Sequence, residues 1–171
     1  FDLKRPLIMG ILNITPDSFS DGGMFLDFNA ALKRAEKMIE EGVDIIDIGG
    51  ESTRPGSDAV SADEELKRIT PIIEAIKKIS DIAISVDTYK PEVMKEVIDM
   101  DVAMINDIFA LQKPNAIDTI KKSNVGICLM HMQGTPKTMQ LNPIYKNVVN
   151  EVKSFLEERV NLLTNEGIDK S

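Results

Sequence analysis

Short apolar runs alternate with helix-type patterns along the chain, and this alternation limits the fold more than any other feature of the sequence. It is typical of an α/β protein in which βα units surround a parallel sheet. Both an open, doubly wound sheet and an eight-fold barrel fit it, although the units present are too few to close a barrel of eight strands. The predicted strands cover residues 7–14, 44–49, 83–88, 103–107 and 125–130, and residues 168–171 resemble the approach to a sixth; the predicted helices cover 29–41, 61–79, 116–122 and 143–165, with another beginning at Pro91.

Capping residues mark several boundaries of the predicted helices. Ser61 is followed three residues later by Glu64, which is the signature of a capping box. Pro91 suits a first helical turn, and Gly42 and Gly167 suit helix ends. The loops after the strands are long and polar, whereas those after the helices are short. We therefore expect the functional site at the C-terminal ends of the strands.

The composition excludes several classes of function. A net charge of −8 and a pI near 4.7 repel a phosphate backbone, so we expect no nucleic-acid partner. No apolar run reaches the roughly 18 residues that span a bilayer, and residues 1–6 lack the layout of a secretory signal, so we expect no membrane partner and a cytoplasmic location. Cys128 is the single cysteine, which excludes intrachain disulfides, and its apolar neighbours predict a buried side chain.

The loop after the first predicted strand, residues 13–23, is dense in hydroxyls, carboxylates and glycines and can fold over a ligand. Asn13, at the strand end, offers a neutral carbonyl oxygen. Such an oxygen suits a hard cation such as Mg²⁺, which keeps water and phosphate oxygens as its other ligands. The alternative is an Asn13 that only ties the loop to the strand.

The loop after the second predicted strand, residues 49–56, has the composition of an anion-binding segment. Its adjacent glycines let the backbone approach a ligand, Thr53 can donate a hydrogen bond, and Arg54 can bind phosphate or carboxylate oxygens through two N–H groups. The segment is neither a P-loop nor a Gly-x-Gly-x-x-Gly motif, so it does not indicate a nucleotide.

Carboxylate and amide side chains end the next two predicted strands, with Asp87 on the first and Asn106 and Asp107 on the second. A buried carboxylate needs a partner. A nitrogen heterocycle with an amino-amidine edge would supply two donors to one carboxylate, and an amide side chain would read an adjacent ring nitrogen. Capping of the following helices is the alternative for Asp87 and Asp107 taken singly.

His131 is the only histidine, so neither a Ser-His-Asp triad nor a two-histidine metal site can form within the chain. We expect a structural role for it. Met130 and Met132 flank it and can pack against a flat ring, although core filling is the commoner reason for a methionine.

Two segments indicate a family. Residues 10–23 (GILNITPDSFSDGG) and 47–56 (DIGGESTRPG) resemble the two signature loops of dihydropteroate synthases, and residues 85–88, 105–107 and 129–134 follow in the family's order. The resemblance implies a (β/α)8 TIM barrel, of which this chain covers about the first five βα units. It also implies a Mg²⁺-dependent transferase of folate biosynthesis, which condenses 6-hydroxymethyl-7,8-dihydropterin diphosphate with 4-aminobenzoate and releases 7,8-dihydropteroate and pyrophosphate.

The resemblance also assigns residues to the site. It implies that Asn13, Thr53 and Arg54 are the catalytic residues, with Asn13 at the metal and the other two at the diphosphate. The remaining assignments are Asp87 and Asn106 to the pterin, Met130 to the pterin pocket, and Phe19, Ser52 and Pro55 to the aminobenzoate site that sulfonamides also occupy.

The chain departs from the family because it lacks three later segments of a complete member: an Asp-Pro-Gly-Phe-Gly strand, a Ser-Arg-Lys segment and an Arg-x-His segment. These supply a second pterin carboxylate, a lysine shared by both substrates and an anion pocket. We therefore expect residues 1–171 to form a single, incomplete pterin-binding barrel domain that is inactive alone and has two unpaired strand edges. Family dimers use late helices, so a homodimer is an expectation for the full-length parent only.

Two alternatives to an active synthase stay open. One is an inactive fragment that retains part of the pterin pocket. The other is the pterin-binding methyltransferase domain of corrinoid-dependent systems, which shares the barrel and a pterin carboxylate but should lack both signature loops.

Overall fold

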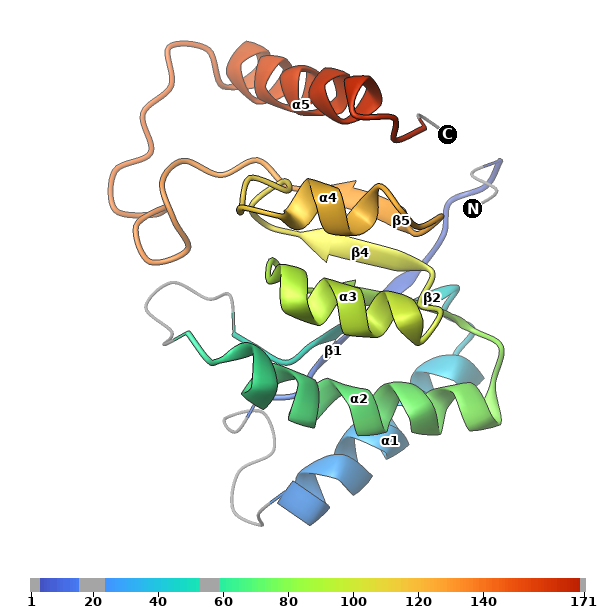
Figure 1. The fold of residues 1–171 in the computed structure, drawn as a ribbon. Helices are drawn as coiled ribbons and strands as arrows, with labels where there is room; N and C mark the ends of the chain where they lie inside the picture. Colours follow the sequence, from blue (N-terminus) through green and yellow to red (C-terminus); the bar gives the residue numbers. More distant parts are fainter. Residues whose placement is uncertain (1–3, 16–23, 53–58, 170–171) are drawn as a thin grey trace.

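Strands and helices alternate strictly in the computed structural model, which describes residues 4–15, 24–52 and 59–169 (Figure 1). The strands are β1 (Met9–Asn13), β2 (Ile45–Gly49), β3 (Ala83–Asp87), β4 (Met104–Asp107) and β5 (Gly126–Leu129). The helices are α1 (Met24–Glu40), α2 (Ala62–Ile79), α3 (Pro91–Asp99), α4 (Ala116–Ile120) and α5 (Val148–Asn165).

The strands form one parallel sheet in the order β1-β2-β3-β4-β5, so each strand pairs with its successor in the sequence. Right-handed crossovers between adjacent parallel strands place every connecting helix on the same side of the sheet. Figure 1 shows the helices gathered on that side. A doubly wound sheet would reverse its strand order and carry helices on both faces. The fold is therefore of the TIM-barrel type, the second of the two architectures that the sequence allowed.

The hydrophobic core lies between the helices and one face of the sheet. Side chains alternate between the two faces of a strand, and every second residue points toward the helices. The buried strand residues on this side include Leu12, Ile46, Ile48, Ile84, Val86 and Ile105, and they pack against helix residues such as Ala31, Ala35, Met38, Ile69, Ile73, Val93, Val97 and Ile120.

The opposite side of the sheet, which we call the open face, carries the other half of the strand residues. Its members are Met9, Ile11 and Asn13 on β1, Ile45, Asp47 and Gly49 on β2, Ala83, Ser85 and Asp87 on β3, Met104 and Asn106 on β4, and Gly126 and Cys128 on β5.

Helices α2 and α3 begin where the sequence predicts. The Ser61 hydroxyl accepts a hydrogen bond of 3.2 Å from the backbone N–H of Glu64, which satisfies one of the free donors at the start of α2. Pro91 opens α3, where its missing N–H costs no hydrogen bond.

Two helices begin elsewhere than predicted. Helix α1 starts at Met24 rather than at residue 29, and Phe28 in this added segment packs against the core. Helix α5 starts at Val148 rather than at residue 143, after Asn147 caps the N–H of Asn150. The Gln133 side chain holds residue 144 outside the helix, because it both donates to the carbonyl and accepts from the N–H of Ile144.

The end of the described chain does not form a strand. The N–H of Ile168 instead donates to the carbonyl of Leu163 over 3.0 Å and closes the C-terminus of α5. Residues 170 and 171, which complete the predicted approach to a sixth strand, lie outside the described residues.

Strands β1 and β5 form the two edges of the sheet, as predicted. Ile8 and Ile11 are 61% and 65% exposed at the β1 edge. Cys128 on β5 is exposed, so the prediction of a buried thiol was wrong. Among the helices that the structure describes, none is both long and apolar enough to cross a bilayer.

Candidate functional site

Polar side chains from neighbouring strands form one row across the open face, at the C-terminal ends of the strands. Asn13 is in register with Gly49, Gly49 with Asp87, and Asp87 with Asn106. Cys128 continues the row on β5, where it is in register with Asn106. The structure thus brings together Asn13, Asp87 and Asn106, three of the residues that the sequence predicted to bind ligand.

Asp47 extends this site one step deeper, in the row that it shares with Ser85 and Met104. Its side chain is 5% exposed, and its Oδ2 accepts a hydrogen bond of 3.0 Å from Nδ2 of Asn106. Asp47 belongs to the motif at residues 47–56, but the sequence did not predict a role for it. An aspartate inside the otherwise apolar segment 45–48 is the signal that could have revealed it, since an ionised group in a buried strand needs a partner.

Three buried oxygens of this site have no hydrogen-bond partner among the described residues. They are Oδ1 of Asp47, Oδ1 of Asp87 and Oγ of Ser85. Buried polar atoms are usually paired, and those that are not often mark a place where a ligand or water binds. The open face therefore presents carboxylate acceptors to a molecule that carries several N–H donors.

Burial, and after it the nearby carboxylates of Asp47, Glu65, Asp107 and Glu51, together raise the pKa of Asp87 to about 7. The Asp87 carboxyl is consequently balanced between its neutral and ionised forms near neutral pH. A ligand that donates hydrogen bonds to the carboxylate would favour the ionised form.

Asp107 has a different role from Asp87. It lies on the helix-covered side of β4, where Oδ1 accepts from the N–H of Phe109 and Oδ2 from the N–H of Leu111, both over 2.8 Å. Burial raises its pKa, and these two backbone hydrogen bonds oppose that effect. The capping alternative therefore describes Asp107 well, although the segment that it organises is the loop after β4.

Arg159 of α5 also binds the loop after β4 through hydrogen bonds. Its guanidinium donates to the carbonyls of Ala110 and Leu111 over 2.9 and 3.1 Å. These two residues have φ angles of 51° and 57°, a left-handed conformation that non-glycine residues adopt at a cost. Arg159 and Asp107 together hold this loop in place.

Asn13 is exposed at the end of β1, as the metal prediction requires. The described residues contain no group of three or more His, Cys, Asp or Glu side chains that could hold a metal ion. Asn13 would supply one amide oxygen to an ion whose other ligands come from water and substrate. This is a donor set that fits Mg²⁺.

Two consecutive glycines let the chain leave β2 beside the site. A Cβ at Gly50 would come within 2.8 Å of Cγ2 of Ile69 and 3.0 Å of Cγ of Glu65, so α2 leaves no room for a side chain. A Cβ at Gly49 would lie 3.3 Å from Oδ1 of Asn13 on the open face. Gly49 keeps the middle of the polar row open between Asn13 and Asp87.

The other predicted site residues have varied positions. Ser52 is half-buried just after β2, and Met130 is half-buried directly after β5. Phe19, Thr53, Arg54 and Pro55 lie outside the described residues. His131 has the expected structural surroundings, with its ring edge-on to Phe155 at 5.0 Å and 5.9 Å from the ring of Tyr145.

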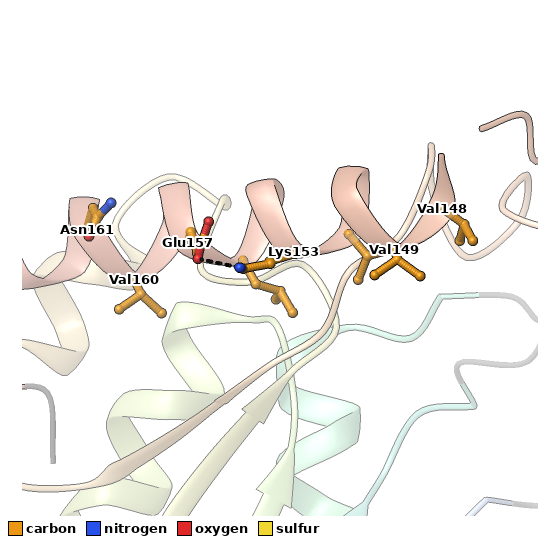
Figure 2. Close-up of a pocket in the computed structure, with 8 residues that line it drawn as sticks. Val148, Val149, Lys153, Glu157, Val160 and Asn161 are labelled. Carbon is orange, nitrogen blue, oxygen red and sulfur yellow. Dashed lines mark ion pairs between the residues drawn. The ribbon is translucent and has the colours of Figure 1, made fainter. Parts of the chain in front are cut away.

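An apolar groove of about 770 Å³ runs along α5 and includes none of the open-face residues. Figure 2 shows several of its side chains along the helix, with Lys153 and Glu157 already joined by an ion pair of 3.7 Å. A substrate site needs polar groups that converge from several elements, and this groove is built by one helix. Its lining residues are Val148, Val149, Val152, Lys153, Leu156, Glu157, Val160 and Asn161.

The sequential sheet, the helices on one face and the polar strand ends define a ligand-binding α/β protein of the TIM-barrel family. Comparison with known proteins agrees. A family model described as "Pterin binding enzyme" matches residues 9–171. The chain is 54% identical to the dihydropteroate synthase of Haemophilus influenzae over 169 residues, which cover 99% of this chain and 62% of that protein.

Solved structures give the same result. The dihydropteroate synthase of Yersinia pestis, in complex with a sulfonamide drug, superposes with a TM-score of 0.91 at 45% identity, covering 99% of this chain and 62% of the other. That of Xanthomonas albilineans with 4-aminobenzoic acid superposes with a TM-score of 0.89 at 47% identity, covering 98% and 59%. This chain belongs to the family of pterin binding enzymes, and it spans about three fifths of the length of these relatives.

Proposed function

We propose that this chain is part of a dihydropteroate synthase, a transferase of folate biosynthesis. The complete enzyme would join 6-hydroxymethyl-7,8-dihydropterin diphosphate to 4-aminobenzoate and release 7,8-dihydropteroate and pyrophosphate. In this reaction the bond from the pterin methylene carbon to the diphosphate oxygen breaks. A bond to the aminobenzoate nitrogen forms, and that nitrogen gives up a proton.

The observation that carries the proposal is the buried Oδ1 of Asp87, which has no hydrogen-bond partner among the described residues and lies beside Asp47 and Asn106. A pterin ring carries an amino-amidine edge, whose two N–H donors suit the two oxygens of one carboxylate. Asn106 donates a hydrogen bond from its Nδ2 to Asp47. This bond fixes the orientation of the Asn106 side chain, and so also the direction of its amide oxygen. The open face thus suits a flat, donor-rich heterocycle, and Met130 adds a polarizable side chain at its edge.

The chemistry asks the protein to stabilise a departing diphosphate and the positive charge left on the pterin methylene. Asn13 would hold Mg²⁺, which when bound would neutralise charge on the diphosphate oxygens. Thr53 and Arg54 would contact the same diphosphate by hydrogen bonding. The carboxylates of Asp47 and Asp87 lie where negative charge would favour a cationic pterin.

The proposal assigns 4-aminobenzoate to a site shaped by Phe19, Ser52 and Pro55. The relative from Xanthomonas albilineans binds 4-aminobenzoic acid, and the one from Yersinia pestis binds a sulfonamide drug. We further propose that residues 1–171 are one incomplete barrel domain without turnover of its own. The complete enzyme would be cytoplasmic, with a homodimer built by its later helices.

The test is turnover by the complete protein, followed as pyrophosphate release with both substrates and Mg²⁺. We expect activity that a sulfonamide inhibits in competition with 4-aminobenzoate. Product formed by the 171-residue chain alone would contradict the proposal that it is inactive by itself.

A substitution then tests the role of Asp87 in the complete protein. Asp87→Ala should abolish pterin binding, measured by calorimetry, far more than it changes the free energy of unfolding. The matched control is Asp99→Ala, which removes an exposed carboxylate from α3 and should leave pterin affinity unchanged. Unchanged pterin affinity in Asp87→Ala, at preserved stability, would defeat the assigned role.

A further inference from the structure

A buried ion-pair cluster lies directly behind the site. The ammonium group of Lys90, the N-cap residue of α3, forms ion pairs with both Glu51 and Glu65. The side chains of Lys90, Glu51 and Glu65 are 12%, 9% and 1% exposed. One cation therefore joins two carboxylates that lie almost wholly out of contact with water.

Glu51 is the most heavily bonded member of this cluster. Its Oε1 accepts from the hydroxyl of Tyr89 over 2.8 Å, and its Oε2 accepts both from Lys90 and from the backbone N–H of Val60 over 3.2 Å. The Glu51 side chain thus ties the start of the β2–α2 connection to its end and to the chain that follows β3.

The cluster is attached to the two strand ends that form the middle of the site. Glu51 follows Gly49 by two residues, and Lys90 follows Asp87 by three, while Gly49 and Asp87 are register partners. The guanidinium of Arg68 adds a hydrogen bond of 2.9 Å to the carbonyl of Gly50 and fixes the same turn to α2.

Stability alone is a weak reason for such a cluster. Desolvating two carboxylates and an ammonium costs free energy that their attraction only partly offsets, and apolar replacements of buried ion pairs are often neutral or stabilising. Directed hydrogen bonds, in contrast, fix the relative position of the elements that carry them. The arrangement therefore points to a role in geometry.

We infer that Lys90 is a positioning residue, which holds Glu51 against Glu65 and thereby fixes the end of β2, with Gly49 and Ser52, against Asp87. The inference rests on the proposed function, because the site that it orders is the substrate site of that reaction. Without Lys90, two buried carboxylates would repel each other beneath the turn, and Glu51 would move toward solvent.

The experiment uses the complete protein and three variants. Lys90→Met should lower kcat/KM roughly 10- to 100-fold, with a raised KM for 4-aminobenzoate, because a displacement on the order of 1 Å has effects of this size. Lys90→Arg should recover most of the activity, since a guanidinium can bind two carboxylates. Lys95→Met, the same change at an exposed position of α3, should match the wild type.

The outcomes separate this inference from the proposed function. Wild-type protein without turnover would overturn the proposed function. If the wild type is active and a folded Lys90→Met variant has unchanged KM and kcat, the positioning role is overturned. It is also overturned if the variant loses kcat at unchanged KM and the loss only follows the fraction of unfolded protein. If Lys90→Met does not fold, the double variant Lys90→Met/Glu65→Gln removes one charge of each sign, and it should fold while keeping the raised KM.

Discussion

Asn106 donates a hydrogen bond of 3.0 Å to Asp47, although these residues lie on β4 and β2 with β3 between them. The two side chains meet across the open face of β3, beside Ser85 and Asp87. This contact joins the three middle strands at the level of the site, and it orients the Asn106 amide before any ligand binds.

The free energy of unfolding should depend on pH through Asp87. Its pKa in the folded chain, about 7, lies above its ordinary value of 3.8, so folding favours the protonated form. The stabilising contribution of the neutral carboxyl is complete below pH 3.8 and is lost as the pH rises to about 7. Asp87→Asn keeps a neutral group, so it should be more stable than wild type by roughly 2–4 kcal/mol at pH 8.

Urea unfolding of the 171-residue chain at several pH values measures this difference. The advantage of Asp87→Asn should shrink steadily as the pH falls below 7. An advantage that is the same at pH 5 and pH 8 would mean that Asp87 does not titrate in this range.

Asp47→Asn should lower the pKa of Asp87. The Asp47 charge is the largest of the carboxylate effects that raise it, after burial itself. We expect a fall of about one pH unit, the size of the effect of one nearby charge in a partly buried site. The change would be followed by NMR titration of the Asp87 carboxyl carbon. The control is Asp44→Asn, which removes a half-buried carboxylate paired with Arg5 and should leave the Asp87 titration unaltered, because Asp44 is not among the groups that raise the pKa of Asp87.

Gly50→Ala should destabilise the chain by about 2 kcal/mol, the usual cost of overpacking. The new methyl group would meet Ile69 and Glu65 at 2.8 and 3.0 Å on a packed helix that has no space to move. Gly49→Ala is the matched comparison and should cost less, since its nearest contact is the exposed side chain of Asn13 at 3.3 Å. Thermal unfolding of both variants measures the two losses of stability. Equal melting temperatures would contradict the close packing described at Gly50.

Cys128 should react with iodoacetamide in the folded chain. The residue is exposed, but partial burial of its sulfur and, after it, the charges of Asp47 and Asp87 raise the pKa of the thiol. The reaction should therefore be slow at neutral pH and should accelerate as the pH rises, because the thiolate is the nucleophile. Mass spectrometry of the native protein would show a single added group, and none in Cys128→Ser. A rate as low as that of global unfolding would show that the thiol is inaccessible.

The sequence predicted the order of elements because apolar runs and helix periodicity are local signals. It also placed Asn13, Asp87 and Asn106 correctly at strand ends. It did not separate Asn106 from Asp107, yet strand parity does, because Asp107 lies on the same side as the buried Ile105.

Other features depend on contacts between distant residues. The apolar neighbours of Cys128 in the chain predict a core residue, but Cys128 is exposed because β5 is an edge strand. The start of α5 depends on Gln133, eleven residues before Ile144. The cluster around Lys90 joins residues up to 39 positions apart, and no local pattern indicates it.

Successive side chains along β2 point to opposite faces of the sheet. Asp47 lies on the open face, where the ligand would bind, while Ile46 and Ile48 lie in the hydrophobic core. Inserting or deleting one residue within this strand would exchange the two sets, with a carboxylate driven among the helices and isoleucines facing the ligand. Length changes within β2 should therefore be lethal to folding and binding together. Variation in length among natural or engineered versions of this chain should be confined to the connections between strands and helices.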